Sequence, residues 1–133
     1  MNGRVAYLDS SAFVKLLVME PESAALRMAL ARWPERASAG LLRTEVVRSL
    51  RRSGNGALVG PARRLFRSLR LVRVDELLLD RAGELDPVQL RSLDAIHLAA
   101  AMTIGSDLSV VFTYDDRLRD AAQASGLVVM APA

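Results

Sequence analysis

Short apolar runs of strand length alternate with helix-length segments along the whole chain, and this alternation constrains the fold more than any other feature. Strands are predicted at 4–9, 70–74, 108–115 and 127–130, with a weak short strand or turn at 37–40. Helices are predicted at 12–20, 22–33, 41–52, 61–69, 76–85, 92–104 and 116–125. Because strands joined through helices run parallel and are covered on both faces, we expect an α/β/α sandwich with a mostly parallel central sheet. At this length, residues 1–133 are expected to form a single domain.

The absence of cysteine excludes several kinds of chemistry. A chain without Cys has no disulfide, no thiolate nucleophile and no cysteine-ligated zinc or iron–sulfur site. A reducing cytosol is the simplest compartment for it. We expect no signal peptide, because Arg4 is followed by only four apolar residues before Asp9. We also expect no membrane segment, because uninterrupted apolar runs such as 98–102 are far too short to cross a bilayer.

Positive charge is concentrated in the middle of the chain. Between Arg43 and Arg73 there are nine arginines and a single acid, Glu45. A block of one sign usually forms a solvated face, and on a cytosolic domain it also suits binding to a polyanion. Both interpretations stay open from the charge distribution alone.

Two short motifs share one pattern, in which an apolar strand leads into an acid and then into a helix. The motif "AYLDSS" places Asp9 at the end of the first strand, and "FTYDDR" places Asp115 at the end of a later strand. In a parallel sheet the strands end at one edge, where ligand sites form. If the two strands are neighbours, the two carboxylates lie side by side. The alternative is that each Asp only caps its helix, and Ser10 or Ser11 also provides a cap after the first strand.

Two further acids lie on predicted helices. Glu45 lies at the border between the apolar stripe and the basic face of helix 41–52, where it either serves a site or pairs with Arg48. Asp94 lies in the first turn of helix 92–104, where an acid suits the helix dipole. Because Ser92 already provides a capping residue, capping does not require Asp94.

Four carboxylates that converge repel one another and therefore require a cation. Oxygen ligands without cysteine, and with at most one histidine, favour Mg²⁺ or Mn²⁺ over zinc. Such ions hold phosphate oxygens and activate water for attack on a phosphodiester. An acid-lined metal site beside a basic face therefore suits a nuclease, in which arginines hold the nucleic-acid backbone by charge.

His97, the only histidine, follows Asp94 by three residues and shares its helix face. The pair suggests a transition-metal site, but a di-iron bundle needs a second His-bearing helix, which this chain lacks. We expect His97 to pack within its alanine-rich helix and to hydrogen-bond a neighbouring loop or backbone group.

Five motifs follow one another across essentially the whole chain: "YLDSSAFVKLL", "TEVVRSLRR", "LRSLDAIHLAAAM", "FTYDDRLRDAA" and "GLVVMAP". In this order and spacing the sequence resembles the PIN-domain family, and within it the VapC-type ribonuclease toxins of bacterial type II toxin–antitoxin systems. The resemblance implies a PIN-like fold and an endoribonuclease that depends on Mg²⁺ or Mn²⁺ and acts in the bacterial cytoplasm. It also implies an RNA substrate, a cognate VapB-type antitoxin, and assembly into a homodimer and a toxin–antitoxin hetero-oligomer.

The resemblance also implies roles for individual residues. The catalytic and metal-holding acids would be Asp9, Glu45, Asp94 and Asp115, with Glu45 acting directly or through water. The hydroxyls that support the site or position water would be those of Ser11 and Thr113. The residues that contact RNA or the antitoxin would include Arg48, Arg51 and Arg52.

Asp116 has three interpretations: a supplementary metal ligand, an acid at a helix start, or an ion-pair partner for Arg119. The alternative for the whole chain is a degenerate PIN domain that binds nucleic acid or a partner protein without cleavage. The presence of all four acids argues against that alternative, and a requirement for Mg²⁺ would distinguish the two.

Overall fold

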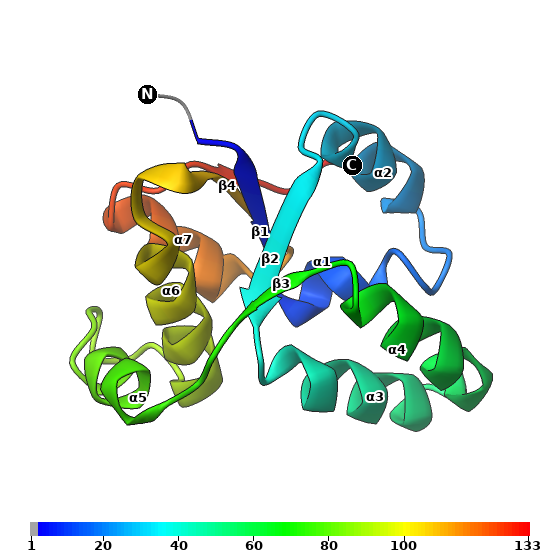
Figure 1. Ribbon diagram of the computed structural model, residues 1–133, viewed down its shortest axis with the longest axis horizontal. Coiled ribbons are helices and arrows are strands. Elements are labelled where there is room, and N and C mark those ends of the chain that lie inside the picture. The colour runs from blue at the N-terminus through cyan, green and yellow to red at the C-terminus, as the bar shows by residue number, and fades with distance from the viewer. Residues whose placement is uncertain (1–2) are drawn as a thin grey trace.

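The computed structural model describes residues 3–133, and its centre is a five-stranded sheet in which each neighbouring pair of strands runs parallel (Figure 1). In spatial order the strands are β3-β2-β1-β4-β5. Their bounds are β1 Val5–Leu8, β2 Glu35–Ala39, β3 Arg70–Val72, β4 Leu108–Phe112 and β5 Val129–Met130. The first strand is therefore central, and β4 is its immediate neighbour.

Helices cover both faces of the sheet (Figure 1). On one side lie α1 Ser10–Val14, α2 Ser23–Leu30, α3 Leu42–Arg52 and α4 Val59–Phe66, and on the other lie α5 Glu76–Gly83, α6 Ser92–Ile104 and α7 Asp116–Ala124. Two short 3-10 turns occupy Gly56–Leu58 and Gly105–Asp107. The expected α/β/α sandwich with a mostly parallel sheet is confirmed. Within residues 3–133, no helix combines the length and the apolar character needed to cross a bilayer.

The central strand is apolar along both of its faces because helices bury both. Tyr7 of β1 belongs to a buried cluster with Ala99 of α6. The next residue, Leu8, belongs to a separate cluster with Leu26 of α2 and Phe112 of β4. Since successive side chains of a strand point to opposite faces, β1 joins the two helical layers into one core.

Phe13 anchors α1 to the helices that follow it. Its ring is fully buried and stacks on Phe66 of α4, with 5.4 Å between ring centroids. Both rings belong to a cluster with Leu42 and Val46 on the inner face of α3. This packing fixes the rotation of α3 and with it the direction in which Glu45 points.

Most elements differ in length from the sequence prediction by a few residues, and two of these differences have a clear physical reason. The first helix, expected through residue 20, ends at Val14, and the chain continues in tighter turns such as the 3.0 Å bond from the Leu16 N–H to the Phe13 oxygen. The weak strand or turn at 37–40 is a full strand, Glu35–Ala39. Pairing with β1 on one side and β3 on the other outweighs the low strand propensity of its small residues.

Candidate active site

Asp9 follows β1 and caps α1, and its side chain also faces a hollow in the surface. Its Oδ1 atom accepts the Ala12 backbone N–H at 3.0 Å and the Ser11 hydroxyl at 2.7 Å, and its Oδ2 atom accepts the Thr113 hydroxyl at 2.6 Å. Only 4% of Asp9 is exposed. Burial raises the pKa of Asp9, and the hydrogen bonds from Thr113 and Ser11 oppose that shift. The expectation of a Ser10 or Ser11 cap is wrong, because the cap is the buried carboxylate itself.

Asp115 occupies the equivalent position after β4 and caps α7. Its Oδ1 atom accepts the backbone N–H groups of Arg117 at 2.9 Å and Leu118 at 3.1 Å. Because β1 and β4 pair in parallel, their ends lie side by side, as the two motifs predict. Asp9 and Asp115 line one hollow of about 370 Å³ at that edge. Each acid therefore caps a helix and faces the same hollow, so the two interpretations of these motifs are compatible.

Asp94 lies in the first turn of α6 and caps nothing. The expectation of a Ser92 cap is wrong, because the helix begins at Ser92 itself and Arg91, in the capping position, makes no side-chain cap bond. The Oδ2 atom of Asp94 is buried and accepts no hydrogen bond within residues 3–133, although the Nε atom of Arg91 lies 3.5 Å away. Burial and the nearby charge of Asp115 raise the pKa of Asp94, and Arg91 opposes this. A buried carboxylate oxygen in this state is open to a cation.

Glu45 reaches the same hollow from α3 and is held there by His97. The Nε2 atom of His97 lies 2.7 Å from Oε1 of Glu45, and its Nδ1 atom lies 2.6 Å from the Tyr7 hydroxyl. Burial raises the pKa of Tyr7 well above its ordinary value of 10.0, so the phenol keeps its hydrogen. Both nitrogens of His97 are engaged by protein groups, which confirms that it packs and hydrogen-bonds. Its partners, however, are two side chains rather than a loop or a backbone group.

All four predicted acids thus line one hollow, although they come from four different places in the chain. The full lining is Asp9, Ser10, Ser11, Glu45, Arg91, Ser92, Leu93, Asp94, His97 and Asp115. Among residues 3–133, no three acidic, His or Cys side chains stand close enough to ligate one ion together. Mg²⁺, however, usually keeps several waters and takes only one or two carboxylates from the protein. A set of carboxylate oxygens that includes the unbonded Oδ2 of Asp94 fits such an ion.

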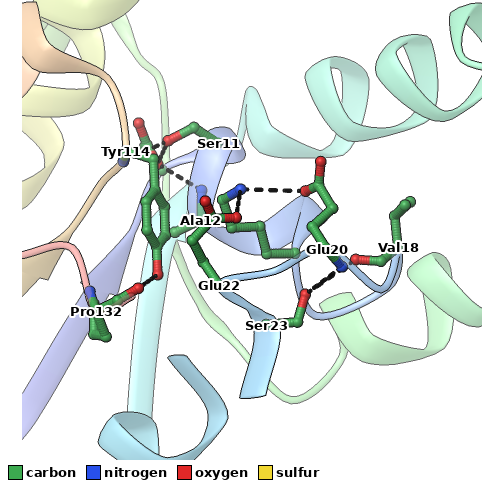
Figure 2. A network of polar contacts seen from close by, with 10 residues as sticks. Ser11, Ala12, Val18, Glu20, Glu22, Ser23, Tyr114 and Pro132 are labelled. Carbon is green, nitrogen blue, oxygen red and sulfur yellow. Dashed lines mark hydrogen bonds and ion pairs between the residues drawn. The ribbon is translucent and has the colours of Figure 1, made fainter. Parts of the chain in front are cut away.

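Two hydroxyl groups tie the strand ends together beside Asp9. The Oγ1 atom of Thr113 donates to Asp9 and accepts the Asp115 backbone N–H at 3.0 Å. The Oγ atom of Ser11 donates to Asp9 and accepts the Tyr114 backbone N–H at 2.9 Å, a contact visible in Figure 2. Both hydroxyls therefore orient the Asp9 carboxylate and link it to the chain around Asp115.

Arg91, which no sequence motif assigns to the site, lies between two of the acids. Its Nη2 atom is 3.4 Å from Oδ2 of Asp115 and its Nε atom is 3.5 Å from Oδ2 of Asp94, so it balances both charges. The spacing of three residues between Arg91 and Asp94 is the sequence signal for this contact. Asp116, by contrast, is not among the lining residues. Its side chain is 80% exposed and pairs with Arg119 at 2.8 Å.

A second hollow, of about 550 Å³, adjoins the acidic one and shares Glu45 with it. Arg48 and Arg52 of α3 line it, and Arg51 does not. Residues three or four apart lie on one helix face, so Arg48 and Arg52 follow Glu45 along one side of α3. A larger hollow, of about 770 Å³ between residues 86–90 and α7, contains none of the four acids. The basic block therefore meets the acids at the second hollow.

The raised pKa values of Asp9 and Asp94 predict how stability depends on pH. A carboxyl group whose pKa is raised by folding stabilises the fold fully below its ordinary value of 3.8, and this stabilisation is lost as the pH rises through the folded-state value. In EDTA, we expect the wild type to gain stability relative to Asp9→Asn as the pH falls from neutral into the mildly acidic range. Urea unfolding of the two proteins measures this difference. Saturating Mg²⁺ is expected to remove this pH-dependent difference in stability. Parallel pH curves for the two proteins in EDTA would contradict a raised pKa for Asp9.

Comparison with known proteins gives consistent matches over nearly the whole chain. A family profile described as PIN domain matches residues 6–124. Ribonuclease VapC46 from Mycobacterium tuberculosis is 53% identical over 126 residues, which cover 95% of this chain and 96% of that protein. The chain also matches a toxin-antitoxin complex from Klebsiella pneumoniae with a TM-score of 0.71, at 21% identity and over 96% of this chain and 98% of that one. The match to Mycobacterium tuberculosis VapC20, described as a Sarcin-Ricin loop cleaving toxin, has a TM-score of 0.73 at 18% identity and covers 92% and 96% of the two chains. At such low identity the two structural matches show the fold alone.

Proposed function

Because this chain belongs to the PIN-domain family, we propose that it is a divalent-metal-dependent endoribonuclease that acts as the toxin of a toxin–antitoxin pair. One observation carries the proposal: four carboxylates from separate parts of the chain line a single hollow at the carboxyl edge of the sheet. The ribonuclease activity named for the 53% identical relative supports it. The adjoining hollow with Arg48 and Arg52 supports a polyanionic substrate.

In this proposal, Asp9, Asp94 and Asp115 hold Mg²⁺ or Mn²⁺, and Glu45 contributes directly or through water. When bound, such an ion neutralises charge on the phosphate and supplies a water nucleophile near neutral pH. The chain itself holds the carboxylates in place. Hydrogen bonds from Thr113 and backbone N–H groups fix Asp9 and Asp115 before any ion arrives. We assign no metal contact to Asp116, because its exposed side chain pairs with Arg119.

RNA contact is assigned to Arg48 and Arg52, which line the hollow next to the acids. Lys15, which lines the same hollow, has its charge balanced by Glu20 at 3.3 Å and Glu22 at 2.9 Å. The two arginines are therefore the cations that this hollow offers to a phosphodiester backbone. Such contacts set affinity and orientation without reading the base sequence.

The proposal includes control by a cognate VapB-type antitoxin, because a free ribonuclease damages its own cell. The solved toxin-antitoxin complex with the same fold supports a partner of this kind. We further propose that residues 1–133 form one PIN-like domain that acts in the bacterial cytoplasm. It would assemble as a homodimer and, with the antitoxin, as a hetero-oligomer.

A degenerate PIN domain that binds RNA or a partner protein without cleavage is the second candidate. Two observations favour it: Arg91 already balances the charges of Asp94 and Asp115, and no three ligating side chains within residues 3–133 converge on one point. A bound divalent ion would have to compete with this arginine.

Incubation of the purified protein with RNA in the presence of Mg²⁺, Mn²⁺ or EDTA tests the proposal. We expect cleavage with either ion and none in EDTA, with products that carry a 5′-phosphate and a 3′-hydroxyl, and we expect expression of the chain to arrest growth. Binding of RNA without cleavage in all three conditions would favour the degenerate domain. Cleavage that persists in EDTA would contradict the metal-dependent mechanism.

A further inference from the structure

The only histidine of the chain lies in the middle of a hydrogen-bonded series that runs from the sheet to α3. Tyr7 of β1, which is fully buried, contacts Nδ1 of His97 on α6, and Nε2 of His97 contacts Glu45 on α3. His97 itself is 2% exposed. Three elements that are distant in sequence are thus joined by two short contacts of 2.6 and 2.7 Å.

The chemistry of the three groups limits where the imidazole hydrogen can lie. A carboxylate only accepts hydrogen bonds, so Nε2 of His97 carries the hydrogen that it donates to Glu45. The Tyr7 phenol carries a hydrogen near neutral pH, and in the neutral Nε2–H tautomer Nδ1 accepts it. The alternative is a doubly protonated ring that donates to the phenol oxygen, and it has the same heavy-atom distances. As a donor, Tyr7 favours from the far side of the ring the tautomer that presents Nε2–H to Glu45.

Without His97, Glu45 has another partner within reach. Arg48 follows it by three residues on the same helix, a spacing at which opposite charges commonly pair. Among residues 3–133, however, the ion-pair distance recorded for Glu45 is to His97, and Arg48 is not involved. The histidine therefore holds the carboxylate at the border of the two hollows, in a contact with His97 rather than in an ion pair with Arg48.

We propose that His97 is a positioning residue, which holds the Glu45 carboxylate in the hollow through an Nε2–H tautomer set by Tyr7. The consequence for RNA cleavage rests on the proposed function. The orientation of Glu45 is a property of the metal-free fold, so it can be measured without any assay of RNA cleavage.

Nitrogen-15 NMR of the metal-free protein tests the tautomer. Because the chain has a single histidine, the imidazole resonances belong to His97. We expect the signature of a neutral ring with the hydrogen on Nε2 and with Nδ1 accepting. Tyr7→Phe is expected to shift the Nδ1 resonance, and Glu45→Gln to shift the Nε2 resonance. A hydrogen on Nδ1 in the wild type, or a spectrum that neither variant changes, would overturn the proposal.

Two substitutions of His97 then separate positioning from packing. His97→Gln retains an amide N–H donor for Glu45, and His97→Leu retains apolar bulk without a donor. We expect His97→Leu to weaken Mn²⁺ binding or kcat by about 10- to 100-fold, with His97→Gln recovering most of the loss and KM for RNA unchanged. Thr103→Val, on the same helix, is the control, because the Thr103 hydroxyl donates to the Ala99 oxygen within α6 and Thr103 does not line the acidic hollow.

Equal losses in the folded His97→Gln and His97→Leu proteins would overturn the proposal, because packing alone would then explain both. If His97→Leu does not fold, Tyr7→Phe replaces it in the Mn²⁺ titration. Unchanged Mn²⁺ affinity in Tyr7→Phe would also overturn the proposal. A wild type that shows the expected NMR signature but cleaves no RNA would support the positioning of Glu45 and contradict the proposed function.

Discussion

Replacement of Asp94 by Asn is expected to lower RNA cleavage by at least about 100-fold, because loss of a metal-holding carboxylate exceeds the 10- to 100-fold typical of its supporting partners. The Oδ2 atom of Asp94 accepts no hydrogen bond within residues 3–133, and the side chain does not cap α6. The substitution therefore removes a charge and its 3.5 Å ion pair with Arg91, but no helix cap and no hydrogen bond to Oδ2. Cleavage rates at saturating Mg²⁺, together with Mn²⁺ affinity, measure the effect.

Asp80→Asn is the matched control for this change, because Asp80 is an exposed acid on α5 that does not line the hollow. We expect it to retain wild-type cleavage. Asp9→Asn also removes an acid of the site, but Asp9 accepts three hydrogen bonds that position the start of α1, so its loss of activity has two causes. Full cleavage by a folded Asp94→Asn protein would contradict the assignment of the metal site.

The meeting of Asp9 and Asp115 is predictable from sequence because it depends on few unknowns. Each acid follows an apolar strand, and parallel strands end at one edge. The remaining requirement is that β1 and β4 be neighbours, which they are. The resemblance to PIN domains contributes the other two acids, because helix periodicity alone leaves Glu45 and Asp94 with ordinary interpretations.

The contacts of His97 and Arg91 are harder to predict, because they depend on how whole elements rotate against one another. His97 and Glu45 are separated by 52 positions and His97 and Tyr7 by 90, so no local spacing relates them. The contact of Arg91 with Asp115 likewise spans 24 positions. Only its contact with Asp94 has a local signal.

Helix capping shows where local reasoning fails. At both starts a Ser near the boundary looks sufficient as a cap, and in both cases the capping position is the residue before the helix, Asp9 for α1 and Arg91 for α6. Asp9, rather than Ser10 or Ser11, caps α1 because its carboxylate accepts the Ala12 N–H directly. The Ser11 hydroxyl instead donates to that carboxylate and orients it. The position of the cap thus decides whether an acid has a structural role. Asp9 caps its helix and also lines the hollow, whereas Asp94 lines the hollow without capping.

Replacement of Phe13 by Ala is expected to cost about 3–5 kcal/mol of stability, a large part of the roughly 5–15 kcal/mol that holds a typical domain together. The helix α1 has only five residues, too few to be stable alone, so its position depends on packing. Phe13 supplies that packing through its stacked contact with Phe66 and its cluster with Leu42. Its loss therefore loosens the element that Asp9 caps as well as the core.

Urea unfolding with and without Mg²⁺ measures this effect, and Met28→Ala is its control because Met28 is 77% exposed. We expect Met28→Ala to change stability by no more than about 0.5 kcal/mol, as is usual for surface positions. Phe13→Leu keeps much of the buried volume and should fall between the two. Because Asp9 and Glu45 flank the Phe13 cluster, Phe13→Ala should also weaken Mn²⁺ binding under conditions where the protein is still folded. An unfolding midpoint equal to that of Met28→Ala would show that α1 is held by something other than this ring.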